Sequence, residues 1–399
     1  MRSTALWTLA GLCLATCNPP TRRQATPADA PAFEGGGADP NAPARAPTDP
    51  SRPYAFMGRF DLKDPNGWRY GRMSWPGSAV GATFEGTGIS ARLADAGARD
   101  GNKKVHNQLD VQIDDGAPTV LRLQGGVSWY PLAEGLSPGP HTVWLRKRTE
   151  PWVGSVAFQG FVPQEGNLTG APGASPRRLE FIGAAAEAGY GATESGARDG
   201  CEFSVDTENA NLAYPRRVAD LLGADYANIS YSNKGVYRNL FPQRDSTTLP
   251  QLYDRIEPHD GAPWDFTAWQ PDAVIIGLGG TDFDALGGSG SKAYRLPPPD
   301  EAAFVRAYAD FLRLVRAKNP KAAVLCLINP LEDDTHQARS LLKKYLQAAL
   351  AAVGDPSMLL LELPPYEGDT YGCDNQPDAA LHAAMAEQVA AALRDALGW

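Results

Sequence analysis

The sequence predicts two folded domains in tandem, a β-sandwich followed by an α/β domain built on a parallel sheet. Three observations support this prediction. Residues 54–165 contain many short runs in which polar and apolar residues alternate, as they do in half-buried strands. Residues 176–399 alternate near-continuous apolar runs with helical periods, which is typical of parallel strands covered by helices. The 399 residues, 43% of them hydrophobic, are enough for two cores.

The strands expected in the first domain are short and are separated by turns rich in Gly, Asp and Pro. No helical period interrupts them. This spacing predicts a β-sandwich or a jelly roll. The expected strands are Tyr54–Phe60, Ala82–Phe84, Ile89–Leu93, Leu109–Ile113, Thr119–Leu123, His141–Arg146 and Gly154–Phe161.

The second domain is expected to hold a five-stranded parallel sheet with helices on both faces. Its apolar runs are Leu179–Gly183, Tyr226–Tyr231, Ala273–Leu278, Ala322–Ile328 and Leu359–Leu363. The helical periods between and after them are Ala213–Leu222, Glu301–Ala317, Thr335–Ala352 and Ala379–Leu397. A ligand site in such a sheet lies at the carboxyl ends of the strands. Those ends are Gly183–Glu187, Ser232–Gly235, Gly279–Asp284 and the loop around Asp374.

The N-terminus has the pattern of a targeting segment. Residues 1–17 combine one positive charge at Arg2 with a short apolar stretch, which predicts a signal peptide. Leu14-Ala15-Thr16-Cys17 resembles a bacterial lipobox, so Cys17 is expected to carry the lipid. Plain secretion, with a cysteine near the cleavage site, is the alternative. Residues 18–53 are mostly Pro, Ala, Gly and Asp, which predicts a disordered tether to an anchor in the periplasm or on the cell surface.

Charge and cysteine content restrict the partners. The net charge of −9 and the absence of long Lys/Arg runs argue against nucleic acid and against an anionic membrane surface. Contact with a membrane is therefore expected only through the lipid anchor. Export permits disulfides. Cys201 and Cys373 both lie in expected loops and either pair or remain apart, whereas Cys326, in the apolar run AAVLCLI, is expected to be a buried thiol.

Several separated motifs occur in the order of a known family. They are RRLEFIGAAAEAGYG, CEFSVDTENANLAYP, YSNKGVYRN, WDFTAWQPDAVIIGLGGTDF and YGCDNQP, preceded by GRFD, FEGTGI and HTVWLRKRTE. Together they resemble the SGNH/GDSL hydrolases, and in particular carbohydrate esterase family 2, the acetyl esterases of plant polysaccharides. The resemblance implies a three-layer, doubly wound SGNH sheet preceded by a jelly roll.

The chain departs from this family at the reacting groups. Ester hydrolysis needs a serine nucleophile and a histidine base. The first motif, Gly183-Ala184-Ala185, has Ala185 at the position of the nucleophile. The last motif has Gln376 at the position of the base, and a glutamine cannot accept that proton. The resemblance leaves only the orienting acid, Asp374.

The oxyanion positions differ too. The family has a glycine where Asn233 stands and an asparagine where Thr281 stands. A non-glycine residue need not hold the backbone geometry of the glycine. The family also often has a tryptophan at Asn375. The losses at Ala184, Ala185, Asn233, Thr281 and Gln376 together favour a catalytic centre that has decayed or been repurposed.

No serine or histidine elsewhere in the sequence is a strong candidate to replace the nucleophile or the base. The serines and histidines considered as substitutes are Ser204, Ser230, Ser232, His336 and His382. Each is better explained by a structural or capping role. A glycosidase pair among Glu187, Asp282, Asp284 and Asp374 remains open, because retaining and inverting enzymes use two carboxylates. No His, Cys or carboxylate cluster has metal-ligand spacing, so no cofactor is expected.

Three functions compete. The main hypothesis is an exported protein, lipid-anchored at Cys17, that binds polysaccharide, acetylated or not, without hydrolysing it. The first alternative is an active carbohydrate O-acetyl esterase of xylan, mannan or glucan that uses non-standard groups. The second is a structural or interaction protein. The residues expected to contact the glycan are Tyr190, Tyr237, Arg238 and Asp282. Trp264 and Trp269 are better explained by core packing.

Overall fold

A computed structural model of the chain describes Arg45 and residues 51–62, 71–100, 103–259, 261–287, 293–334 and 337–399. These residues fall within one compact unit. The expected signal peptide, Cys17 and His336 lie outside the described residues, as does the expected tether apart from Arg45 and residues 51–53.

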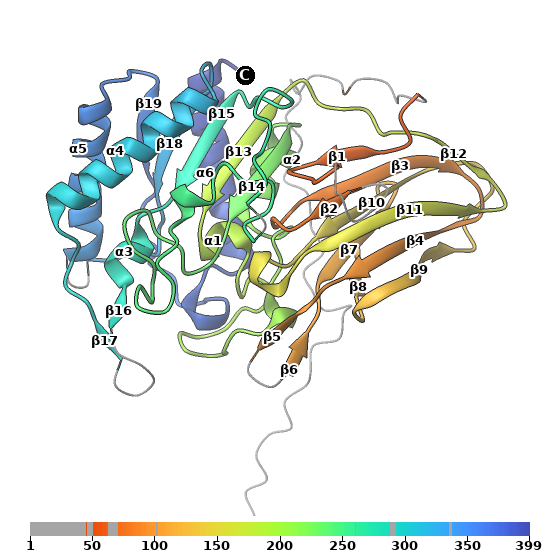
Figure 1. The fold of residues 1–399 in the computed structure, drawn as a ribbon, viewed down its shortest axis with the longest axis horizontal. Helices are drawn as coiled ribbons and strands as arrows, with labels where there is room; N and C mark the ends of the chain where they lie inside the picture. The colour runs from red at the N-terminus through yellow and green to blue at the C-terminus, as the bar shows by residue number, and fades with distance from the viewer. Residues whose placement is uncertain are drawn as a thin grey trace, which may run out of the picture. The chain divides into compact units, whose positions relative to one another are not determined.

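The N-terminal part is built from two antiparallel sheets that share one core (Figure 1). The strands of the first sheet pair in the order β1-β3-β10-β7-β8, with β12 beside β3, and those of the second in the order β2-β11-β4-β9. A small hairpin of β5 and β6 stands apart. The bounds in the first sheet are β1 Ala55–Met57, β3 Ala79–Glu85, β7 Gln108–Ile113, β8 Thr119–Arg122, β10 Pro140–Lys147 and β12 Asn167–Gly170. The others are β2 Arg72–Met73, β4 Gly88–Asp95, β5 Ala98–Asp100, β6 Lys103–Val105, β9 Gly126–Glu134 and β11 Val156–Gln164.

Alternation along the strands explains this core. In β4, Ile89, Ala91 and Leu93 are fully buried, while Ser90 and Arg92 between them are partly or fully exposed. Successive side chains of a strand point to opposite faces, so one face of β4 faces the first sheet and the other faces solvent. The expected sandwich of antiparallel sheets is confirmed in this form.

One long strand escaped the sequence analysis. β9 covers Gly126–Glu134 and contains Pro131, and a proline usually argues against a strand. In the structure β9 lies at the edge of its sheet, and the pairing register with β4 shifts next to Pro131. An edge strand with such an irregularity tolerates a proline because one ladder hydrogen bond is not required there.

The C-terminal part is a three-layer α/β fold. Its five parallel strands pair in the order β14-β13-β15-β18-β19 (Figure 1). The strands are β13 Arg178–Gly183, β14 Asp225–Ser230, β15 Ala273–Gly277, β18 Ala323–Ile328 and β19 Met358–Glu362. The helices are α1 Ala185–Ala188, α2 Tyr214–Leu221, α3 Gly280–Asp284, α4 Glu301–Lys318, α5 Ala338–Val353 and α6 Ala379–Leu397. Short elements complete it: β16 Leu286–Gly287, β17 Tyr294–Arg295 and 3-10 turns at Val205–Thr207, Leu249–Gln251 and Cys373–Asn375. A further 3-10 turn, Pro151–Val153, lies between β10 and β11 in the N-terminal part.

The sheet is buried on both faces. Leu179 and Phe181 of β13 pack with α2 and α6, whereas Ile182 of the same strand packs with α4 and α5. This explains why the strands read as continuous apolar runs. Cys326, within β18, is a buried free thiol, as expected. β13 has β14 on one side and β15 on the other, so the strands that follow β13 in the sequence lie on both sides of it in the sheet. Ligands of doubly wound folds bind beyond the carboxyl ends of the strands at such a point.

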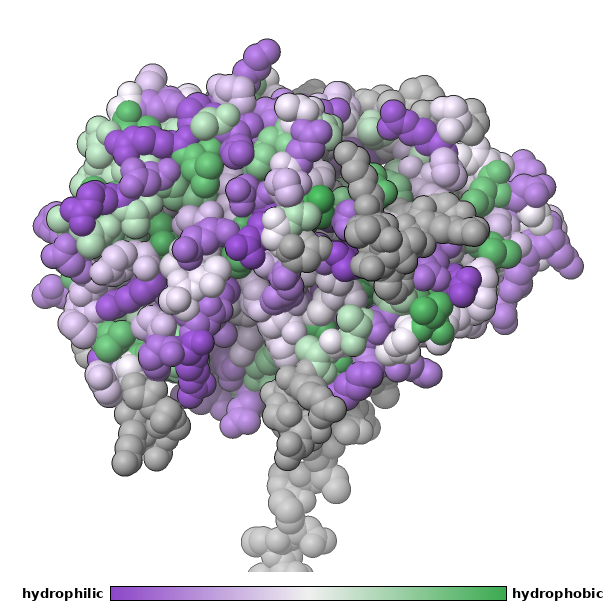
Figure 2. Space-filling model, in the orientation of Figure 1, coloured by the Kyte–Doolittle hydropathy of each residue, from purple (hydrophilic) through white to green (hydrophobic). Residues whose placement is uncertain are grey.

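No helix among the described residues is long and apolar enough to span a membrane. On the face shown in Figure 2, hydrophilic and hydrophobic residues are interspersed, and the coloured hydrophobic residues form only small groups.

A buried ion pair joins the two parts. Arg59, from the segment after β1, is 1% exposed, and its guanidinium lies 3.0 Å from the carboxylate of Glu180 on β13. It also donates hydrogen bonds to the carbonyl oxygens of Tyr253 and Arg255. The hydroxyl of Tyr253 donates to the same carboxylate at 2.6 Å. Both terminal nitrogens of the Arg59 guanidinium and both oxygens of the Glu180 carboxylate are thus paired across the contact, whereas Arg59 Nε has no hydrogen-bond partner among the described residues. Buried ions require such pairing.

Removing one member of this pair should be costly. Arg59→Ala leaves the Glu180 carboxylate buried without its cation, and we expect the free energy of unfolding to fall by about 3–5 kcal/mol. Lys344→Ala, which removes an exposed ion pair to Glu301, should cost about 1 kcal/mol or less. Urea unfolding of both variants measures the difference. Equal midpoints for the two variants would contradict the anchoring role of Arg59.

Candidate functional site

The candidate site lies where β13, β14 and β15 end, at the edge of the sheet that the sequence analysis selected. β13 ends at Gly183, and Ala185 begins the short helix α1. The methyl group of Ala185 offers no nucleophile. Gln376 donates its backbone N–H to the carbonyl oxygen of Cys373, and neither Ala185 nor Gln376 lines the cleft described below.

A buried glutamate fills the space beside Ala184, next to Ala185. Glu187 is 1% exposed. Its carboxylate accepts hydrogen bonds from the Ala184 N–H and from the Tyr214 hydroxyl, both at 2.8 Å. A Cβ atom at either Gly183 or Gly277 would lie 2.1 Å from this side chain. Both glycines therefore make room for Glu187, and its carboxylate faces the interior of the protein.

Burial raises the pKa of Glu187 from 4.5 to about 7. Between these two pH values the folded state keeps a proton that the unfolded state has released, so the free energy of unfolding falls as the pH rises. A shift of this size corresponds to roughly 3 kcal/mol. The destabilisation is complete only above pH 7, where the buried group is charged in both states.

Glu187→Gln should therefore stabilise the protein at pH 8 by up to roughly 3 kcal/mol and change it much less at pH 4.5, because the amide does not ionise. Urea unfolding at the two pH values measures this. The matched comparison with the native chain removes the contribution of other buried carboxyls. An identical pH dependence in both proteins would show that Glu187 does not titrate in this window.

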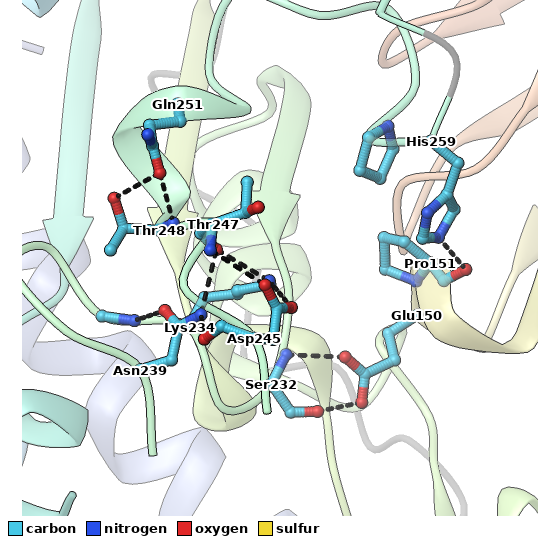
Figure 3. A network of polar contacts seen from close by, with 12 residues as sticks. Glu150, Pro151, Ser232, Lys234, Asn239, Asp245, Thr247, Thr248, Gln251 and His259 are labelled. Carbon is cyan, nitrogen blue, oxygen red and sulfur yellow. Dashed lines mark hydrogen bonds and ion pairs between the residues drawn. The ribbon is translucent and has the colours of Figure 1, made fainter. Parts of the chain in front are cut away.

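The loop after β14 carries the second motif, and a glutamate from the sandwich holds it (Figure 3). Glu150 is fully buried, and its carboxylate accepts hydrogen bonds from the Ser232 N–H at 2.6 Å and from the Ser232 hydroxyl. The indole of Trp152 donates to it at 3.1 Å. Asn233, at the oxyanion glycine position, has φ 65°, a left-handed conformation that asparagine tolerates better than most residues.

The far side of the same loop is fixed by an ion pair and an amide (Figure 3). Lys234 pairs with Asp245 and donates to the Thr247 carbonyl oxygen at 2.8 Å. The Asn239 side chain donates to the Asp245 and Thr247 carbonyl oxygens at 2.8 and 3.0 Å, and it accepts from the Gly235 N–H. The loop after β14 is therefore held from two directions, and the Ser232 hydroxyl is buried and hydrogen-bonded to Glu150.

Asp282 holds the loop and does not face the cleft, which corrects its expected role in glycan contact. It is fully buried and accepts the N–H groups of Val236, Tyr237 and Arg238 at 2.9, 2.8 and 2.7 Å. Burial raises its pKa to about 6. The Arg238 guanidinium donates to the carbonyl oxygens of Asp282 and Pro297, so Arg238 braces the loop. Tyr237 is 42% exposed and also lies outside the cleft lining.

The third motif, Gly279–Asp282, follows β15 and leads into α3. Thr281 is the second residue of α3 and is partly exposed. Beside it, a Cβ atom at Gly280 would lie 1.7 Å from a carboxylate oxygen of Glu332. A second acidic side chain thus packs against the strand ends. Glu187 and Asp282 are both buried, which speaks against a glycosidase pair that uses either of them, because its carboxyls must reach the substrate. Asp284 and Asp374 are exposed.

The last motif is tied to the loop after α1. Asp374 accepts a hydrogen bond from the Tyr190 hydroxyl at 2.9 Å. The Asn375 side chain accepts a hydrogen bond from the Asp199 N–H and donates one to the Asp199 carboxylate, both at 2.7 Å. A disulfide joins Cys201 to Cys373. The structure therefore contains the cysteine pairing that the sequence left open.

An open cleft of about 380 Å³ lies beside these loops. Its lining is rich in aromatic side chains, with a cation and an ion pair at the rim. The lining residues are Trp152, Tyr190, Phe203, Tyr231, Ser232, Asn233, Lys234, Asn239, Phe241, Arg244 and Asp245. Aromatic faces with a few polar groups are suited to a flat ligand that has both apolar and hydroxylated sides.

Of the four expected glycan contacts, only Tyr190 lines this cleft. The sequence analysis quoted the segments that hold Glu150, Phe203 and Lys234 but selected none of these residues. Trp152 and Phe241 each lie two residues beyond the end of a motif, HTVWLRKRTE and YSNKGVYRN respectively. Position next to a motif was the only available signal, because the contacts join segments far apart in the chain.

Other candidates lie away from the cleft lining. His382 is buried on α6, where its Nδ1 accepts the Tyr214 N–H at 3.3 Å and burial lowers its pKa to about 3. His259 lies 3.2 Å from the Pro151 carbonyl oxygen (Figure 3). Trp264 packs near the Arg59 guanidinium. Among the described residues, no group of His, Cys, Asp and Glu is arranged to hold a metal ion.

Two family models match the chain. Residues 185–396 match the GDSL-like lipase/acylhydrolase family, which defines the class of the α/β domain. Residues 56–172 match the carbohydrate esterase 2 N-terminal model. With both matches in this order, the chain belongs to carbohydrate esterase family 2.

Relatives agree with this assignment. The cellulase/esterase CelE of Acetivibrio thermocellus is 30% identical over 89% of this chain, which spans only 41% of that protein's length. An acetylxylan esterase/glucomannan deacetylase of Cellvibrio japonicus is 26% identical over 77% of the chain and 80% of that protein.

Solved structures agree as well. A family two carbohydrate esterase from Clostridium thermocellum in complex with cellohexaose superposes with a TM-score of 0.76 at 30% identity, covering 87% of this chain and 99% of that one. An active-site mutant of a family two esterase from the same organism, also solved in a complex, gives the same values.

Proposed function

We propose that this family 2 protein binds polysaccharide in its aromatic cleft and does not hydrolyse esters. One observation carries the proposal: the positions of the nucleophile and of the base are occupied by Ala185 and Gln376. Losing one triad member typically costs about 10⁴–10⁶ in rate, and the members act as a unit. Binding is separable from chemistry because the two use partly different contacts.

The substitutions are accompanied by packing that accommodates them. Glu187 fills the space beside Ala184 and over Gly183. Asn233 and Thr281 stand at the oxyanion positions, where preorganised donors are worth about 3–4 kcal/mol each in working enzymes. The complex of the active-site mutant from Clostridium thermocellum supports the proposal, since an altered centre is compatible with ligand binding in that protein.

The second candidate is an active carbohydrate O-acetyl esterase acting on xylan, mannan or glucan. The names of the relatives favour it, because they include acetylxylan esterase and glucomannan deacetylase. It requires a nucleophile other than the family serine. A structural or interaction role is the third candidate, and it requires that the cleft bind no glycan.

The proposal places the protein outside the cytoplasmic membrane, at the periplasmic face or the cell surface, anchored through a lipid on Cys17. We also propose that the N-terminal sheets have the topology of a jelly roll. A tether of the length of residues 18–53 would let the cleft reach a polysaccharide at a distance from the membrane.

Binding to glycans tests the proposal. We expect acetylated xylan, glucomannan or cellohexaose to bind, and Phe241→Ala to weaken the binding about tenfold, or about 1.4 kcal/mol, because an aromatic face of the cleft is lost. Tyr294→Ala, which removes a 60% exposed tyrosine elsewhere, is the matched control. Isothermal titration calorimetry gives the Kd values. Absence of binding to every glycan tested would refute the proposal.

A further inference from the structure

Asp374 is the one retained member of the triad, and it has no histidine to orient. In the structure its carboxylate accepts the hydroxyl hydrogen of Tyr190 at 2.9 Å. Burial and this hydrogen bond raise the pKa of Tyr190 above its usual value, so the phenol stays protonated and donates. The carboxylate that would hold a base in an active esterase thus holds an aromatic side chain of the cleft.

Tyr190 is part of an aromatic wall. Its ring stacks on Phe203 with a centroid distance of 3.8 Å and an angle of 17° between the planes. Phe203 in turn contacts Trp152, 6.1 Å away between centroids. All three line the cleft. Because Tyr190 and Phe203 come from different parts of the loop after α1, their stacking depends on how that loop is held.

Covalent and hydrogen bonds hold that loop against Asp374. A disulfide joins Cys201 to Cys373. Cys201 lies two residues before Phe203, and Cys373 lies directly before Asp374. The Asp374 N–H donates to the Cys201 carbonyl oxygen at 3.0 Å. Asp374 itself has φ 52°, a left-handed conformation that leaves its side chain free to reach Tyr190.

A ring that is fixed before the ligand arrives loses less conformational entropy on binding. A hydrogen bond to a carboxylate is among the stronger ways to fix a phenol. The flat Tyr190–Phe203 pair offers its surface to the C–H face of a pyranose ring, while polar groups at the rim meet hydroxyls.

We propose that Asp374 is a positioning residue that has been reused: it orients Tyr190 so that Tyr190 and Phe203 form the wall on which a pyranose ring of the glycan stacks. This inference rests on the proposed glycan-binding function. In this inference Asp374 contributes to the affinity for a sugar ring and takes no part in proton transfer.

Two substitutions at the same position separate the acceptor from the backbone. Asp374→Gly keeps the left-handed φ and removes the acceptor. Asp374→Asn keeps an acceptor oxygen and tolerates the same φ. We expect cellohexaose or acetylated xylan, whichever the native protein binds, to bind five- to tenfold more weakly to the glycine variant and within about twofold of native to the asparagine variant. Asp369→Gly, at an exposed aspartate of the preceding loop, is the matched control and should leave the Kd unchanged.

A substitution of Tyr190, which donates the hydroxyl hydrogen, provides an independent test if Asp374→Gly does not fold. Tyr190→Phe keeps the ring and removes the donor, and it should weaken binding as much as Asp374→Gly. The double variant should then bind no more weakly than either single variant, because both remove the same hydrogen bond. Isothermal titration calorimetry measures all the Kd values.

The outcomes are distinguishable. If the native protein binds glycan but Asp374→Gly and Tyr190→Phe bind equally well, the positioning role is wrong and the binding function stands. If the asparagine variant is as weak as the glycine variant, the acceptor is not what matters and the inference is also wrong. If the native protein binds no glycan, the proposed function and this inference fail together.

Discussion

The buried carboxylate of Glu150 is the contact on which the site depends. It comes from the sandwich and accepts both the N–H and the hydroxyl of Ser232 in the loop after β14. Hydrogen bonds to a charged group contribute about 1.5–3 kcal/mol each, and a buried carboxylate needs them to offset its desolvation. The sandwich therefore shapes the edge of the parallel sheet as well as packing beside it. Asp282 acts similarly from the other side, since it holds the N–H groups of residues 236–238.

This frame is held by contacts that do not themselves depend on ester hydrolysis. The loops of the catalytic edge are held by buried carboxylates and a disulfide, none of which requires a nucleophile. Glu187 occupies the interior beside Ala184, and Asp374 binds Tyr190 in the absence of a base. A site whose supporting bonds are intact keeps a defined cleft, and a defined cleft is what ligand affinity requires.

The sequence predicted the fold well because periodicity reports burial directly. The run 379–397 was expected as a helix and is α6, and the five apolar runs are the five parallel strands within one residue at each end. The strand at residues 126–134 was missed because Pro131 argues against a strand unless an edge position is known. In the site, the residues at positions 185 and 376, Ala185 and Gln376, could be read directly from the sequence. The roles of Glu150, Phe203 and Asp282 could not, because each depends on contacts between residues that lie 13 to 82 positions apart.

We expect that a family 2 fold with Ala185 and Gln376 at the positions of the nucleophile and the base does not turn over esters. Hydrolysis of p-nitrophenyl acetate and of acetylated xylan by the purified chain tests it most directly, with the heat-denatured protein as the blank and an active family 2 acetylxylan esterase as the positive control. The account predicts that the native chain releases product no faster than the denatured chain. Turnover well above the blank that is lost on denaturation would contradict it and would require a nucleophile other than the residue at position 185.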